Sequence, residues 1–124
     1  MRNFNLNQLR EMTMTIKEIA EMNLQNIQEV LKNYPPNDGR IVIADYTAEE
    51  FAELKKGEDF QQFSQIRRIV VDRLKELGIV DKVILHKIDS VKYYQFLAER
   101  GFTHSQKALA AFADIDFRKG EEKK

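Results

Sequence analysis

Ile41-Val42-Ile43-Ala44 is a continuous apolar run in which three of the four residues are β-branched. This pattern is typical of a strand that is covered on both faces. We therefore predict a first strand at residues 40–46. A similar run, Val83-Ile84-Leu85, predicts a second strand at about residues 82–88.

The segment between the two runs has the pattern of helices. Thr47 followed by Glu50 is a capping box, which predicts a short helix that ends near Gly57. Apolar residues every three or four positions predict a longer helix over about 59–77. A helical crossover of this length allows the two strands to be parallel neighbours with a right-handed connection. We expect their C-terminal ends to share one edge of the sheet.

The segment before the first strand also has a helical period. Apolar residues recur mostly every three or four positions from Leu6 to Tyr34, which predicts either one long helix or two helices that bend near Asn23. Pro35 disfavours a helical conformation at Tyr34, and Asp38-Gly39 predicts a turn. The helical region should therefore end at Tyr34.

Two further helices are predicted after the second strand. Asp89 or Ser90 is a suitable cap for a helix over about 91–100, which Gly101 ends, and Thr103 or Ser105 is suited to begin a last helix that runs through Ala113. We expect residues 1–117 to form a single domain and residues 118–124 to be a frayed charged tail. The fold class is helix-rich, either α/β or α+β, with two short strands.

Composition excludes several classes of function. The 124 residues include 20 basic and 20 acidic side chains, so the formal net charge is zero, which disfavours binding to nucleic acid or to anionic lipid. The chain has no cysteine and two histidines, so we expect no disulfide, no metal site and no cofactor. No apolar run is long enough for a signal peptide or a membrane helix. We expect a soluble, cytoplasmic protein.

Three residues are weak candidates for catalysis. If the strands are parallel, Asp45, His86 and Asp89 fall near the same edge of the sheet, where open α/β folds bind ligands. A carboxylate beside an imidazole is suited to acid–base chemistry. The alternative is that Asp45 and Asp89 initiate helices and that His86 is solvated.

Two residues are candidates for binding a protein partner. Tyr93, Phe96 and Leu97 form one helical stripe that is most simply core, which leaves Tyr94 as a surface contact beside Arg100. Tyrosine and arginine dominate the binding energy of protein interfaces. We therefore predict that Tyr94 and Arg100 contribute to a protein-binding surface.

Residues 15–34 suggest an alternative in which the protein binds DNA. Thr15-Ile16-Lys17-Glu18-Ile19-Ala20-Glu21-Met22 resembles the first helix of a repressor-type helix-turn-helix, with Val30 in the position of the later valine. The glycine of the turn is absent, and the second segment lacks the arginine and hydroxyl side chains that contact phosphates and bases. The resemblance implies a DNA-binding regulator.

Residues 61–102 suggest a second alternative, a small acyltransferase-like enzyme. Their order of long helix, strand, helix and Gly101-Phe102 resembles the last third of the Gcn5-related acetyltransferase fold. Leu97 stands where that family often has a general-acid tyrosine. The pyrophosphate loop would correspond to Gly57-Glu58-Asp59-Phe60, whose two carboxylates would repel phosphate.

The N-terminal region also suggests an assembly. Leu9, Met12, Ile16 and Ile19 have the spacing of the seam of paired helices, and Asn23 follows where a core position would fall. We expect a possible homodimer through this helix. A helix in a monomer would instead use the same face to cover the sheet.

No nucleophile motif, metal cluster or phosphate loop is present in the sequence, so we favour a protein without enzymatic activity. A small protein-binding, regulatory or inhibitor protein, such as an accessory protein of a mobile element, is the function class that we expect. The partner is then a protein of unknown identity.

Overall fold

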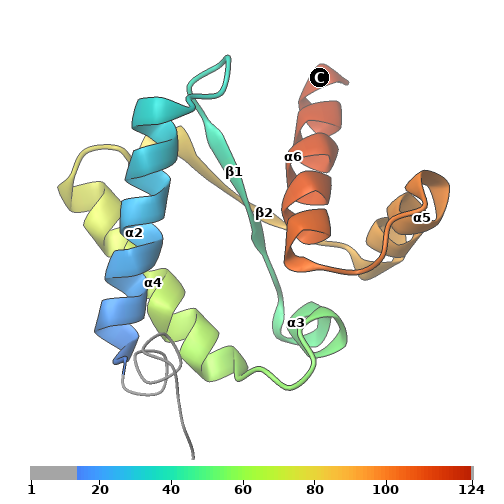
Figure 1. Ribbon diagram of the computed structural model, residues 1–124, viewed down its shortest axis with the longest axis horizontal. Coiled ribbons are helices and arrows are strands. Elements are labelled where there is room, and N and C mark those ends of the chain that lie inside the picture. Colours follow the sequence, from blue (N-terminus) through green and yellow to red (C-terminus); the bar gives the residue numbers. More distant parts are fainter. Residues whose placement is uncertain (1–13, 124) are drawn as a thin grey trace, which may run out of the picture.

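The computed structural model describes residues 14–123 and has the helix-rich α+β architecture that the sequence predicts. Figure 1 shows the two strands and five α-helices that these residues form. A 3-10 turn, Val80–Lys82, precedes the second strand. No helix among the described residues is long and apolar enough to cross a membrane. The elements are α2 (Ile16–Asn33), β1 (Ile41–Asp45), α3 (Ala48–Leu54), α4 (Phe60–Glu76), β2 (Val83–Lys87), α5 (Ser90–Arg100) and α6 (Gln106–Glu122).

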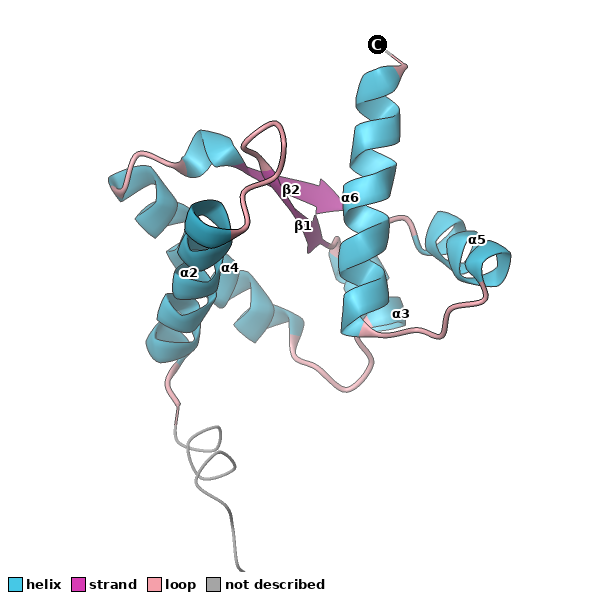
Figure 2. Ribbon diagram, turned by 45° about the horizontal axis from the view of Figure 1, so that its top comes forward, coloured by secondary structure: helices cyan, strands magenta, loops and turns pink. Residues whose placement is uncertain are grey.

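The two strands are parallel neighbours, which confirms the predicted arrangement. Their register pairs Ile41 with Val83 at one end and Asp45 with Lys87 at the other. Figure 2 shows the strands between α6 on one side and the pair α2 and α4 on the other. Because helices cover both faces, a sheet of only two strands is protected from water.

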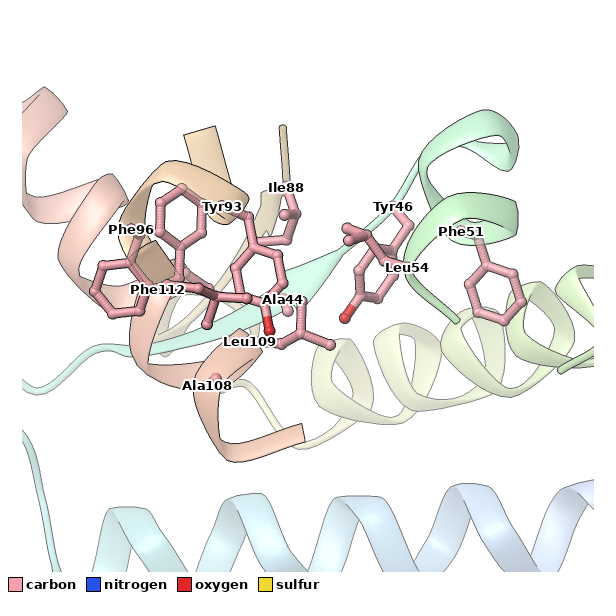
Figure 3. Close-up of a cluster of buried hydrophobic side chains, with 12 residues drawn as sticks. Ala44, Tyr46, Phe51, Leu54, Ile88, Tyr93, Phe96, Ala108, Leu109 and Phe112 are labelled. Atoms are coloured by element: carbon pink, nitrogen blue, oxygen red, sulfur yellow. The ribbon is translucent and has the colours of Figure 1, made fainter. Parts of the chain in front are cut away.

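The alternation of side chains along the strands divides the apolar residues between two clusters. Ile41 and Ile43 of β1 pack with α2 and α4, whereas Val42 and Ala44 pack with α3, α5 and α6. Figure 3 shows the second cluster, with Tyr93 and Phe96 among the residues at its α5–α6 end and Phe51 at its α3 end. Both faces of β1 are therefore built into the core.

Side chains cap the helices at the predicted positions. Thr47 accepts a hydrogen bond from the Glu50 backbone N–H (3.2 Å), and Asp89 accepts one from the Lys92 backbone N–H (3.2 Å). The second half of the capping box is not formed, because the Glu50 carboxylate accepts the backbone N–H of Ser90 in α5 (3.0 Å). Glu50 thus ties the start of α5 to α3.

The apolar stripe of α2 faces α4. Ala20, Leu24 and Ile27 are buried there, while Asn23 is exposed. From Ile16 onwards the helix is continuous, and Leu9 and Met12 of the predicted seam lie outside the described residues. The described members of the predicted seam, Ile16 and Ile19, are partly buried and are not among the residues of this cluster, so the homodimer remains a prediction.

The prediction of a frayed tail from Arg118 is wrong. α6 continues to Glu122, nine residues beyond the predicted end at Ala113. Arg118 donates to Asp38 (2.7 Å) and to the Arg40 carbonyl (3.0 Å), both in the segment that leads into β1. These contacts join residues about 80 positions apart, so local sequence pattern does not reveal them.

We predict that Ile43→Asp and Leu85→Asp each lower the free energy of unfolding by about 3 to 5 kcal/mol, because each places an unpaired charge against the α2–α4 cluster. The two residues are partners in the register of the sheet. Chemical denaturation provides the measurement.

Val91→Asp is the control, since Val91 is 65% exposed and this change should alter stability by less than about 0.5 kcal/mol. Equal stability of all three variants would contradict the strand assignment.

Candidate functional site

The structure does not bring Asp45, His86 and Asp89 together as one catalytic group. Ala44 is the register partner of His86, and strand alternation therefore directs Asp45 and His86 to opposite faces of the sheet. Asp89 caps α5, which is its alternative role. The three side chains have separate partners.

His86 pairs with a residue that sequence reasoning missed. Its Nε2 lies 2.8 Å from Asp116 Oδ2 on α6, and its ring meets the Phe117 ring edge to face at 5.7 Å. Asp116 follows 30 residues later in the chain, with no motif that links the two. The pair attaches α6 to β2 and contains no nucleophile.

Tyr94 and Arg100 lie on α5 and each contacts its own chain. Tyr94 is 41% exposed, and its hydroxyl donates to Glu53 on α3 (2.8 Å). The Arg100 guanidinium lies over the Phe96 ring, 5.2 Å from its centre. Tyr94 lines a shallow, mostly polar pocket of about 440 Å³ beside α3, and Arg100 lines a smaller one of about 160 Å³ beside α6. The exposed face of Tyr94 is still available to a partner.

The C-terminal edge of the sheet carries a more organised arrangement around Arg67. Asp45 at the end of β1 lies opposite Lys87 at the end of β2. Arg67 projects from α4 towards this edge, where its Nη2 donates to the Ala44 carbonyl (3.1 Å) and its Nε lies 3.8 Å from Asp45 Oδ1. This edge is where parallel sheets place ligands.

Arg67 lies in a groove of about 410 Å³, which we call the α4 groove. Asp45, Tyr46 and Lys87 line it from the strand ends, and the remaining lining residues all belong to one face of α4. The apolar ones are Phe60, Phe63 and Val71. The polar ones are Ser64, Arg67, Arg68, Asp72 and Lys75.

The spacing of these residues follows from the helix. They recur every three or four positions along α4, so they form one continuous face. Val70 and Leu74 occupy another face, which is buried among the cluster that α2 shares. The α4 groove is therefore on a side of α4 that the fold leaves open.

Arg67 is a partly buried cation whose donors are only partly used. Its side chain is 19% exposed, and the guanidinium lies over the Phe63 ring, 5.0 Å from the ring centre. Nε is shielded from solvent without a hydrogen-bond partner, and Nη1 also donates to no described residue. Burial lowers the pKa of Arg67, while the Asp45 carboxylate acts in the opposite direction.

The other cations of the α4 groove, unlike Arg67 with Asp45, have no carboxylate within ion-pair distance among the described residues. Among the residues that the structure describes, Arg68, Lys75 and Lys87 form no ion pair. The groove thus combines four cations with two carboxylates, Asp45 and Asp72. In a chain of zero net charge, this is a local excess of positive charge.

By contrast, three other arginines have acidic partners at hydrogen-bond distance. Arg73, on another face of α4, donates to Glu21 (3.0 Å) and Glu76 (2.7 Å). Arg118 donates to Asp38 and to Asp114 (both 2.7 Å). Arg40 donates to Asp38 and Glu121. Arg67 differs from all three, since its nearest carboxylate oxygen is beyond hydrogen-bond distance.

Tyr46 borders the α4 groove and has a hydroxyl that is shielded without a hydrogen-bond partner. The residue is 5% exposed, and burial raises its pKa to about 12. The buried hydroxyl of Tyr93, by comparison, has a hydrogen-bond partner, because its oxygen lies 2.7 Å from His104 Nδ1. His104 Nε2 in turn donates to the Leu54 carbonyl (2.9 Å), which leaves Nδ1 as the acceptor for Tyr93.

The structure corrects the helix-turn-helix alternative. Residues 16–33 form one uninterrupted helix, so residues 15–34 contain no turn and no separate recognition helix.

The acetyltransferase resemblance holds for the order of α4, β2 and α5 only. Asp59 accepts hydrogen bonds from the Gln61 and Gln62 backbone N–H groups at the start of α4, where the family binds pyrophosphate. Among the described residues the sheet has two strands, and no group of three or more acidic or histidine side chains is placed to hold a metal ion.

No protein-family model matches the chain, and no curated protein or solved structure matches it either.

We predict that Tyr46→Phe leaves the free energy of unfolding unchanged or raises it by up to about 1 kcal/mol, because it removes a buried hydroxyl that lacks a partner. Tyr93→Phe is the control and should lower stability by about 1 kcal/mol, since His104 loses its donor. Urea denaturation at neutral pH compares the two. A larger loss for Tyr46→Phe than for Tyr93→Phe would contradict the assignment.

A related prediction concerns alkaline pH. The pKa of Tyr46 rises from 10.0 to about 12 on folding, so the folded state favours the neutral phenol. The resulting stability is fully present below pH 10 and is lost as the pH rises towards 12, by about 2 to 3 kcal/mol. Wild type should therefore lose more stability than Tyr46→Phe over this interval, as measured by denaturation at each pH. An equal loss of stability with pH in wild type and Tyr46→Phe would contradict the raised pKa of Tyr46.

Proposed function

We propose that the protein is a small binding protein without enzymatic activity, which holds an anionic group of a protein partner at Arg67 in the α4 groove. The observation that carries the proposal is the incomplete pairing of Arg67. This partly buried guanidinium makes one hydrogen bond to a described residue, the Ala44 carbonyl, and its nearest carboxylate oxygen is 3.8 Å away. A regulatory or inhibitory role belongs to the same proposal.

The chemistry of arginine supports an anionic ligand. A guanidinium presents five N–H donors in a planar fork, which matches the oxygen pairs of carboxylate and phosphate groups. Hydrogen bonds between ionised groups are about twice as strong as neutral ones. A bound anion would supply Nη1 with an acceptor and offset part of the cost of burying the charge.

The surroundings of Arg67 support the same ligand. Lys87 and Arg68 have no carboxylate partner, so their field adds to that of Arg67. Lys87 is exposed at the end of β2, opposite Asp45 in the register. Exposed cations at the rim of a partly buried site attract an anion before it docks.

We expect Arg67→Gln to weaken the binding of inorganic phosphate by about tenfold, because it removes the charged donor. The measurement is a titration of isotopically labelled protein followed by NMR, at constant ionic strength. Shifts should centre on residues 44–46, 64–68 and 87. Because Arg67 also anchors α4, Lys87→Gln provides a second variant that removes a rim charge only, with an expected loss of about threefold.

Arg73→Gln is the matched control for this titration. It removes an arginine from another face of the same helix, where Glu21 and Glu76 are its partners. Phosphate affinity should be unchanged. Equal affinity of wild type, Arg67→Gln and Lys87→Gln, or shifts centred away from the α4 groove, would overturn the proposal.

A further inference from the structure

We infer that the occupant of the α4 groove is an acidic, extended polypeptide segment of the partner, with apolar side chains between its carboxylates. This inference rests on the proposed function and specifies the ligand. Its evidence is the length of the groove, the order of apolar and charged residues along it and the two carboxylates within it.

The α4 groove is longer than a single small anion requires. Its lining extends from Phe60 to Lys75, which is about 22 Å at the helical rise of 1.5 Å per residue. About seven extended residues at roughly 3.3 Å each cover this distance. A phosphate ion bound at Arg67 would leave most of the groove empty.

Apolar and cationic residues alternate along the groove. Phe60 and Phe63 lie at one end, Arg67 and Arg68 near the middle, Val71 beyond them and Lys75 at the other end. Arg67 and Lys75 are eight residues apart, or about 12 Å along the helix axis. Same-face side chains at positions i and i+4 of an extended peptide are about 13 Å apart. Two carboxylates with that spacing would each reach a cation.

The groove favours a polypeptide over a nucleic acid. Asp45 and Asp72 line it, and both would repel a chain with a phosphate at every residue, whereas the backbone N–H groups of a peptide can donate to them. The Phe63 ring already carries the Arg67 guanidinium on its face and packs against Phe60, so it is not an open platform for base stacking. Apolar peptide side chains suit the remaining surface of Phe60 and Val71.

The test uses a pool of octapeptides with Asp or Glu at alternate positions and random residues between them. The comparison probes are the same pool with Asn or Gln at those positions, inorganic phosphate, and an eight-nucleotide single-stranded DNA pool. Competition against a labelled acidic peptide selected from the first pool, read by fluorescence anisotropy, ranks the probes. We expect the selected acidic peptide to bind at least tenfold more tightly than its amide analogue, phosphate or the DNA.

The Lys75→Gln variant distinguishes the binding of an extended peptide from the binding of a single anion at Arg67. Lys75 lies at the opposite end of the groove lining from Phe60, eight residues from Arg67 along α4, so its loss should weaken peptide binding by about threefold and change phosphate affinity by a smaller factor. Arg67→Gln should weaken both ligands, and Arg73→Gln should weaken neither. Arg73→Gln therefore serves as the matched control on the same helix.

These measurements test the acidic-peptide occupant separately from the proposed anion site at Arg67. Two results would overturn the inference while phosphate binding still depends on Arg67. The wild type would select no acidic peptide, or Lys75→Gln would not change the affinity for the selected peptide. In both cases the proposed function would stand. DNA binding tighter than peptide binding would also overturn the inference. If no probe responds to Arg67→Gln or Lys87→Gln, the proposed function itself fails.

Discussion

The parallel pairing of β1 with β2 is the interaction on which the other elements depend. Two strands of five residues do not form a stable sheet alone, and a parallel pair exposes two apolar faces that need cover. The chain meets this need with α4, which lies between the strands in sequence, with α2 packed beside α4, and with α6 on the opposite face. The core therefore consists of two clusters on either side of the sheet.

The same pairing determines where polar groups emerge. Because side chains alternate, Asp45 leaves β1 on the face of α4, while His86 leaves β2 towards α6. Asp45 therefore meets Arg67, and His86 meets Asp116. The separation of Asp45 from His86 is a direct result of the register, in which Ala44 is the partner of His86.

The features that the sequence predicts correctly are local ones. The runs at Ile41 and Val83, the cap at Thr47 and the stop at Gly101 each depend on neighbouring residues. The errors concern contacts that are distant in sequence. The extension of α6 is joined to the start of β1 through Arg118 and Asp38, 80 residues apart. Single-sequence patterns contain no information about such pairs.

The candidate site was missed for the same reason, although part of its signal was present. The polar and apolar residues of the groove recur at a helical period along α4, which a sequence analysis can detect. Their role as a candidate site becomes visible only when the hydrogen-bond partners of Arg67 are compared with those of Arg40, Arg73 and Arg118. That comparison depends on Asp38, Glu21 and Glu121, which lie far in the chain from Arg118, Arg73 and Arg40 respectively.

Arg67 has a structural role and a proposed binding role, and its geometry explains how one side chain serves both. The bond from Nη2 to the Ala44 carbonyl fixes α4 against the end of β1, and it uses one donor of the guanidinium. An arginine with only a structural role is expected to donate hydrogen bonds to carboxylates within the chain. Arg118 does so with Asp38 and Asp114. Arg67 instead is partly buried, and its shielded Nε has no hydrogen-bond partner, which costs stability in the free protein. Such a cost is expected at sites where a fold gives up local stability to hold a ligand.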